Sequence, residues 1–100
     1  MNIYNRSSVT AFYAKNANCK SALEKWYHDV LAANWTKPSD VVKDFNTART
    51  LKNNRAVFEI NGNDYRLIAE INYQKAWVFI KFIGSHAEYD KVNAETVNLF

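Results

Sequence analysis

The sequence predicts an α+β domain in which N-terminal helices cover one face of a small antiparallel β-meander and a short helix follows the sheet. Three observations predict it. Residues 1–54 contain no glycine and have apolar residues at helical spacing. Residues 55–84 have side-chain patterns typical of β-strands, and two of these strands are separated by Asn61-Gly62, a dipeptide that favours a tight hairpin. A polar segment with a helix-capping pattern begins after Gly84.

Composition limits the class of protein. The 100 residues make one domain, residues 1–100, with a net charge of +3 that allows an anionic partner without requiring one. The single cysteine, Cys19, excludes an internal disulfide and a cysteine metal site, and a free thiol suits a reducing compartment. We find no signal peptide and no apolar run of membrane-spanning length, so we expect a cytoplasmic protein without membrane contact.

Three helices are predicted before the strands. Ser7 or Ser8 caps the first, and Asn18 caps the second. The second helix has one apolar stripe, formed by Leu23, Trp26, Tyr27, Val30 and Leu31. Pro38 begins a third, shorter helix, and Trp26 and Trp35 are expected in the core. The buried residues of that third helix are expected to be Val41, Val42 and Phe45.

The hairpin comes next. A two-residue loop at Asn61-Gly62 predicts Ile60 opposite Asn63 and Val57 opposite Arg66. One face of the hairpin then forms the core, with Ala56, Phe58, Ile60, Tyr65, Leu67, Ala69 and Ile71. The other face, which we call the mixed face, carries Arg55, Val57, Glu59, Arg66, Ile68, Glu70 and Asn72.

The third strand, residues 76–84, is predicted to pair Ile71 with Val78, Ala69 with Ile80 and Leu67 with Phe82. The mixed face thereby gains Trp77, Phe79, Lys81 and Ile83. An exposed sheet face is usually polar, so cations set among large apolar groups indicate a surface that a ligand covers. The apolar residues Val97, Leu99 and Phe100 indicate that the C-terminal segment packs back on the domain.

The exit from this strand, "GSHAEYD" at residues 84–90, concentrates groups that can move protons or bind charge. Ser85 and Glu88 form a capping box for a helix that begins at His86. Tyr89 then shares a helix face with His86, and we expect His86 to approach Arg66. A plainer interpretation is equally open: His86 can be an ordinary helix-start residue, Tyr89 can be core, and Arg66 can simply pair with Glu59 or Glu70.

A basic stretch, "ARTLKNNR" at residues 48–55, is predicted to be a loop that enters the hairpin. Cations that hold phosphates beside aromatic rings that stack on bases suit RNA. The predicted RNA-binding residues are Arg49, Lys52, Arg55 and Phe79.

The chemistry that fits is metal-independent RNA cleavage, in which the 2′-hydroxyl attacks the adjacent phosphorus. Histidine titrates near neutral pH, arginine clamps phosphate and tyrosine can donate a proton. The predicted catalytic residues are Arg66, His86, Tyr89 and Lys81. The sequence shows no HExxH motif, carboxylate cluster, P-loop or dinucleotide fingerprint, so we predict no metal and no cofactor.

Residues 53–92, "NNRAVFEINGNDYRLIAEINYQKAWVFIKFIGSHAEYDKV", resemble the HigB family of bacterial toxins within the RelE-like mRNA interferases. The strand "YRLI" and the exit "SHAEYDKV" are the most specific parts. By this resemblance Arg66 matches the family's strand arginine, and His86 and Tyr89 match its exit motif. Lys52, Arg55 and Lys81 match only as members of a variable basic set. Many relatives use a lysine- and arginine-rich centre where this chain has His86, so the resemblance leaves the general base unassigned.

The resemblance implies a ribosome-dependent endoribonuclease that cuts mRNA and stops translation. It also implies a HigA-type helix-turn-helix antitoxin as partner, with operator DNA bound only through that antitoxin. Two other functions remain open from the residues alone. One is a non-catalytic RNA- or ribosome-binding module that uses the mixed face. The other is a protein-interaction domain in which another chain covers Trp77 and Phe79.

Overall fold

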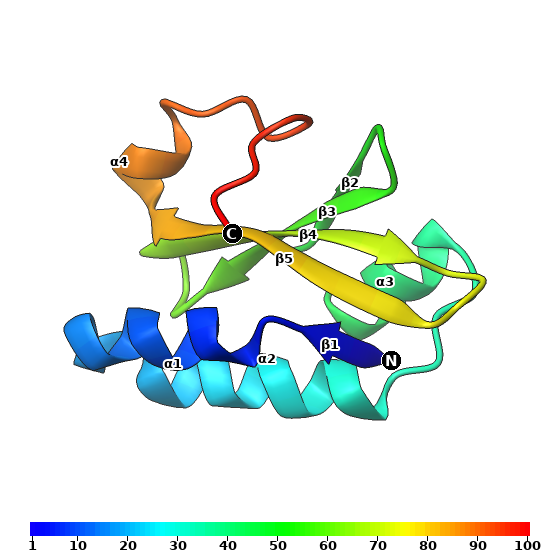
Figure 1. Ribbon diagram of the computed structural model, residues 1–100, viewed down its shortest axis with the longest axis horizontal. Helices are drawn as coiled ribbons and strands as arrows, with labels where there is room; N and C mark the ends of the chain where they lie inside the picture. The colour runs from blue at the N-terminus through cyan, green and yellow to red at the C-terminus, as the bar shows by residue number, and fades with distance from the viewer.

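The computed structural model describes all residues, 1–100, and confirms the α+β class. In Figure 1, α1 and α2 lie beneath the sheet, and α4 and the C-terminal segment lie above it. The elements in chain order are β1 (Asn2–Tyr4), α1 (Arg6–Lys15), the 3-10 helix η1 (Ala17–Cys19), α2 (Lys20–Ala32), α3 (Pro38–Asp44), β2 (Arg49–Leu51), β3 (Arg55–Ile60), β4 (Tyr65–Asn72), β5 (Trp77–Ser85) and α4 (His86–Tyr89).

The sheet has five strands in the order β1-β5-β4-β3-β2. The predicted antiparallel meander is present as β3, β4 and β5. Two edge strands were not predicted: β1 runs parallel to β5, and β2 lies within the stretch predicted to be a basic loop. Each has three residues, which is too short for an alternating pattern to show.

The predicted two-residue hairpin loop was wrong. Asn61 and Gly62 do adopt the positive φ values, 56° and 66°, that a turn of this kind needs. However, β3 ends at Ile60 and Ile60 pairs with Tyr65, so the loop comprises residues 61–64. Glu59 therefore lies opposite Arg66. Because the register moved by two residues, every side chain of the hairpin kept its predicted face.

The pairing of β4 with β5 is partly as predicted. Ile71 pairs with Val78 and Ala69 with Ile80, but a β-bulge at Lys81 then shifts the register. After it, Ile68 lies opposite Phe82 and Leu67 opposite Ile83. Phe82 therefore belongs to the mixed face and Ile83 to the core, the reverse of the prediction. An extra residue in one strand exchanges the faces of all residues that follow it.

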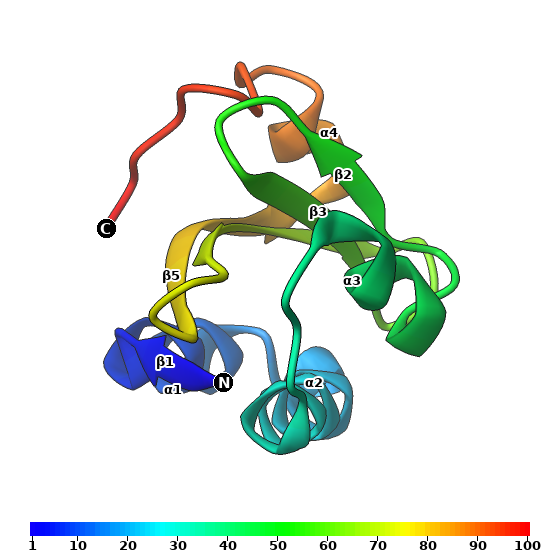
Figure 2. The same ribbon diagram turned by 90° about the vertical axis from the view of Figure 1, so that its right-hand side faces the viewer.

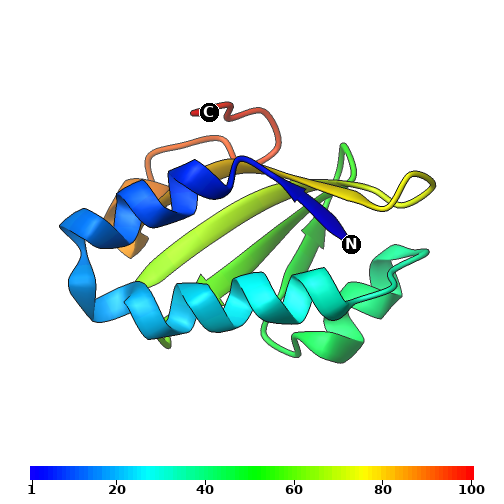
Figure 3. The same cartoon turned by 60° about the horizontal axis from the view of Figure 1, so that its bottom comes forward.

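The main core lies between the helices and the sheet. Figure 3 shows α1 and α2 side by side across the same face of the sheet. The ring of Phe58 contacts Trp26, Trp35 and Phe45, with centroid distances of 5.4, 6.2 and 5.1 Å. Trp26 and Trp35 are buried, which confirms their predicted place.

The predicted helix caps differ from the structure. The residue before α1 is Asn5, in the left-handed region with φ of 82°, and no side chain caps the helix. Ser8 instead donates its hydroxyl hydrogen to the Asn5 carbonyl. Asn18 does not cap α2; its side chain accepts a hydrogen bond from the Tyr65 hydroxyl at 2.9 Å. Leu31 and Val42, predicted to be buried, are exposed.

A second, smaller apolar cluster lies on the mixed face. Val57, Ile68 and Phe82 are buried there beneath side chains of α4 and of the C-terminal segment, including Tyr89, Ala94 and Val97. Figure 2 shows this segment and α4 on the side of the sheet opposite α1 and α2. The centre of the mixed face is thus covered by the protein's own chain. The last residues, Leu99 and Phe100, are exposed.

Candidate functional site

A pocket lies at one end of the mixed face, where β2, β3 and β4 approach α4. The cavity has a volume of about 250 Å³ and is lined by Thr47, Arg49, Val57, Glu59, Arg66 and Tyr89. We call it the arginine pocket. The sheet register assembles it, because Arg49 pairs with Val57 and Glu59 pairs with Arg66 on adjacent strands.

Arg66 is held in one orientation. Only 9% of the residue is exposed, and its guanidinium donates to the side chain of Asn63 and, at 3.3 Å each, to the carbonyls of Asn63 and Tyr65. Its Cζ lies 5.8 Å from the centroid of the Tyr89 ring. It forms no ion pair with Glu59 or Glu70, since the ion pairs of the protein are Lys25–Asp29, Arg55–Glu70 and His86–Asp90.

Tyr89 reaches the pocket from α4. The capping box that begins this helix is present as predicted: the Glu88 amide donates to Ser85 Oγ at 3.1 Å, and the Ser85 amide donates to Glu88 Oε1 at 2.9 Å. Arg49 donates a hydrogen bond to the Tyr89 hydroxyl oxygen. The phenol therefore accepts from a cation, and its own hydrogen can donate toward a ligand.

Glu59 is the pocket residue whose place the sequence did not predict. It was assigned to the mixed face, but the predicted register placed Val57 opposite Arg66. Because the loop has four residues, Glu59 lies opposite Arg66 on the neighbouring strand. Glu59 is exposed and forms no ion pair. It is the only carboxylate lining the cavity.

His86 lies outside the pocket lining. It begins α4, its Nδ1 is 3.2 Å from Asp90 Oδ2, and 44% of its side chain is exposed. No hydrogen bond or ion pair joins it to Arg66, whose guanidinium contacts Asn63, Tyr65 and Tyr89. The expected approach of His86 to Arg66 therefore produces no polar contact between them.

The remaining predicted residues also lie outside the pocket. Lys52 is exposed in the turn between β2 and β3. Lys81 Nζ lies 5.9 Å from the centroid of the Phe79 ring, and Phe79 in turn lies between Tyr4 and Trp77, at 5.9 and 6.1 Å. Arg55 is only 6% exposed, because the C-terminal segment covers it.

The pocket's side chains have complementary chemical abilities. Two guanidinium groups can bind and neutralise a phosphate, a carboxylate can accept a proton and a phenol can donate one. No three or more His, Cys, Asp or Glu side chains converge as metal ligands anywhere in the chain. None of the helices combines the length and apolar character needed to cross a membrane.

The fold and the pocket define a class: a small α+β protein whose sheet, together with one short C-terminal helix, places two arginines and a tyrosine around one cavity. Residues 19–92 match the family described as HigB_toxin, the RelE-like toxic component of a toxin-antitoxin system. The mRNA interferase HigB of Escherichia coli O6:H1 is 30% identical over 94 residues, which cover 92% of this chain and 91% of that protein. The chain belongs to the HigB toxin family, as its strand and exit motifs predict.

Proposed function

We propose that this protein is an endoribonuclease that cleaves mRNA on the ribosome and thereby inhibits protein synthesis. The observation that carries the proposal is the arginine pocket, in which two arginines, a tyrosine and a carboxylate surround one cavity. Membership of a toxin family and the name of the similar Escherichia coli protein support the same reaction.

In this proposal the two arginines of the pocket bind the phosphate. Arg66 is oriented before any substrate arrives, because Asn63 and two carbonyls hold its guanidinium. Such preorganised donors stabilise the charge that develops on the phosphorane without reorganising during the reaction. Arg49, which is exposed and joined to Tyr89, supplies the second cation.

Proton transfer requires one group on each side of the phosphate. The 2′-oxygen forms a bond to phosphorus, the bond to the 5′-oxygen breaks, and the products are a 2′,3′-cyclic phosphate and a 5′-hydroxyl. We assign acceptance of the 2′ proton to Glu59, since it lines the cavity and has no other partner. Tyr89 donates to the leaving 5′-oxygen, because its own oxygen already accepts from Arg49. His86 remains the alternative proton-transfer group.

The other basic and aromatic residues are proposed to bind the flanking RNA. Lys81 and Phe79 lie on β5 beside the exposed Trp77, and Lys52 lies at the tip of the β2–β3 turn. Aromatic rings of this kind can stack on unpaired bases. The proposed partners are mRNA on the ribosome and a HigA-type helix-turn-helix antitoxin, which would bind operator DNA for the pair. The proposed site of action is the cytoplasm.

Induced expression with mapping of mRNA 5′ ends tests this function. We expect the wild-type protein to arrest growth and to create new 5′ ends inside translated codons. Arg66→Ala should lose both effects, whereas Lys15→Ala, on the exposed side of α1, should keep them. Neither arrest nor cleavage from a folded wild-type protein would reject the proposal.

The second candidate is a non-catalytic RNA- or ribosome-binding module. The observation that favours it is the row of Tyr4, Phe79 and Trp77 with Lys81, which lies outside the arginine pocket. Growth arrest without new mRNA 5′ ends would select this function. Binding to phosphates would then weaken steeply as salt rises, which separates RNA binding from apolar binding to another protein.

A further inference from the structure

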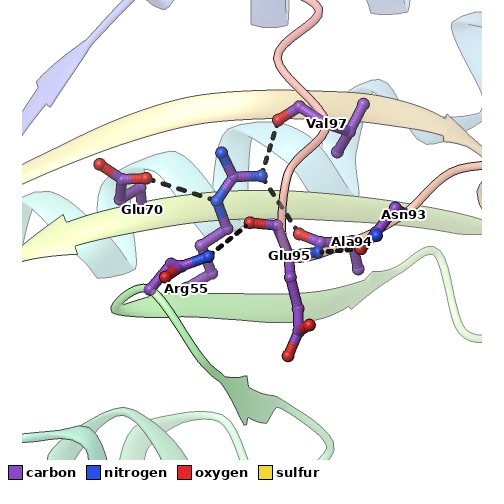
Figure 4. Close-up of polar contacts among 7 residues, drawn as sticks. Arg55, Glu70, Asn93, Ala94, Glu95 and Val97 are labelled. Carbon is purple, nitrogen blue, oxygen red and sulfur yellow. Dashed lines mark hydrogen bonds and ion pairs between the residues drawn. The ribbon is translucent and has the colours of Figure 1, made fainter.

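The C-terminal residues 93–100, which we call the strap, cross the centre of the mixed face. Figure 4 shows the Arg55 guanidinium pointing at two strap carbonyls. Its Nη1 donates to the carbonyl of Ala94 at 3.1 Å and to that of Val97 at 2.6 Å, while its Nε lies 3.4 Å from Glu70 Oε1. The strap thereby buries this positive charge on β3 almost completely, since only 6% of Arg55 remains exposed.

The other hydrogen bonds that join the strap to the rest of the domain also use its main chain. Asn53 Nδ2 donates to the Glu95 carbonyl at 3.0 Å, and the Leu99 amide donates to the Lys81 carbonyl at 2.9 Å. The Ala94 and Val97 side chains pack on the cluster of Val57, Ile68 and Phe82. No ion pair holds the strap, because all three ion pairs of the protein lie elsewhere.

The strap contains neither a helix nor a strand, and its last two side chains are exposed. The neutral hydrogen bonds of the strap contribute little net free energy each, the two from the Arg55 guanidinium contribute more, and ordering eight residues of chain opposes all of them. Segments with these properties open locally at low cost while the rest of the domain stays folded.

The covered surface adjoins the arginine pocket. Val57 belongs both to the cluster beneath the strap and to the lining of the pocket. Removing the strap would uncover, beside the proposed phosphate site, one guanidinium with two free donors and part of the apolar cluster that contains Phe82. A guanidinium that donates two hydrogen bonds to oxygen atoms can bind phosphate oxygens in the same way, and an aromatic ring can stack on a base.

We propose that the strap is a displaceable cover and that single-stranded RNA takes its place, with a phosphate on Arg55 where the carbonyls of Ala94 and Val97 now lie. The inference rests on the proposed function and adds a regulatory step to it: RNA binding is coupled to release of the strap. Arg55, predicted from the sequence to bind RNA, would then do so only in the open form.

The test measures binding of an unstructured oligoribonucleotide whose 2′-oxygens carry methyl groups, so that it cannot be cleaved. A chain that ends at Asn93 should bind about 5- to 20-fold more tightly than the full chain, because binding no longer includes the cost of opening. The affinities of both chains should fall with salt at the same log–log slope, because Arg55 binds a phosphate in both complexes.

Two variants serve as controls. Arg55→Ala in the shortened chain should remove the gain in affinity and lower the log–log salt slope by about 0.7, the value for one phosphate contact. Phe100→Ala in the full chain changes an exposed strap residue and should leave affinity unchanged. Circular dichroism establishes that each variant is folded.

Hydrogen exchange on the full chain gives a second measurement that needs no truncation. Addition of the oligonucleotide should accelerate exchange of the Leu99 amide, which the strap's bond to Lys81 protects. Equal affinity of the two chains, or unchanged or slower exchange at Leu99, would overturn the strap proposal and leave the proposed function standing. Binding by neither chain, together with absence of mRNA cleavage in cells, would reject the proposed function itself.

Discussion

At the scale of single residues, the arginine pocket depends on how Arg66 is held. Its partner Asn63 lies in the hairpin loop, and the two carbonyls that the guanidinium contacts are those of Asn63 and of Tyr65, the first residue of β4. The loop therefore positions the guanidinium as well as reversing the chain. A lysine at this position would keep the charge but not the planar fork of donors that phosphate recognition uses.

Arg66→Lys is accordingly expected to lower the rate of mRNA cleavage about 100-fold, the usual cost of losing a preorganised donor. The measurement is the cleavage rate on ribosomes programmed with a defined mRNA. Arg6→Lys is the matched control, since Arg6 lies on α1 with its Cζ 5.0 Å from the Tyr27 ring centroid, away from the pocket. Similar rates for Arg66→Lys and the control would contradict the role of Arg66.

Replacing Glu59 or His86 by the neutral residue glutamine shows which of the two is the general base. Glu59→Gln should lower the cleavage rate about 10²–10⁴-fold, the range for losing a general base. His86→Gln should change the rate far less, because His86 does not line the cavity. The opposite ranking of the two variants would assign the base to His86.

Residue identity and local motifs predicted the two arginines and the tyrosine of the candidate site, and they missed Thr47 and the placement of Glu59. Arginine and tyrosine can be recognised from their chemistry and from local motifs, so Arg49, Arg66 and Tyr89 were found. The placement of Glu59 beside Arg66 depends on the hairpin register, and a loop of four residues instead of two moves it by two positions. His86 shares a helix with Tyr89, but helical spacing does not determine which side chain points into a cavity.

At the scale of elements, the strand exit is shaped by one glycine. A Cβ added at Gly84 would lie 2.6 Å from Phe82 Cζ and 3.3 Å from the Cβ of Glu88. The Phe82 ring cannot move aside freely, because it is buried in the small cluster on the mixed face. The glycine thus lets this ring pack close to the beginning of α4.

Gly84→Ala should therefore lower the free energy of unfolding by about 1–2 kcal/mol through overpacking. Urea denaturation measures it. Combining the change with Phe82→Leu, which removes the ring, should give a loss smaller than the sum of the two single losses. Strict additivity would show that the glycine is needed for another reason.

Asp40, on α3, makes the stability of the folded protein depend on pH in a direction that follows from the shift in its pKa. The Thr36 backbone amide, with help from its hydroxyl and from Lys37, holds the pKa of Asp40 below its usual value. The contribution to stability is present above the usual value of about 3.9 and is lost as pH falls through the lowered folded-state pKa.

Asp40→Asn should consequently lower the melting temperature at pH 7, and the difference from wild type should shrink as the pH falls below the usual aspartate value of about 3.9. Glu24→Gln removes a charge of the same sign on α2 and serves as the control. A difference from wild type that persists unchanged in acid would contradict the electrostatic cause.

At the scale of the whole molecule, the layers could be predicted and the coverage of the mixed face could not. Helical periodicity and alternation are local patterns, and they predicted three helices, the meander and α4. The strand β1 joins β5 across more than 70 residues of sequence, as in the pairing of Asn2 with Trp77, and three residues carry too little pattern to indicate it. The strap has no periodicity at all, so only Val97, Leu99 and Phe100 indicated that it packs back.

Product analysis on programmed ribosomes with purified protein tests whether mRNA is cleaved by 2′-hydroxyl attack in the arginine pocket. We predict that the upstream product ends in a 2′,3′-cyclic phosphate and that the downstream product begins with a 5′-hydroxyl. A single 2′-O-methyl group at the cleaved nucleotide should block the reaction. Cleavage that survives this modification, or that survives Arg66→Ala at the wild-type rate, would contradict 2′-hydroxyl attack in the arginine pocket.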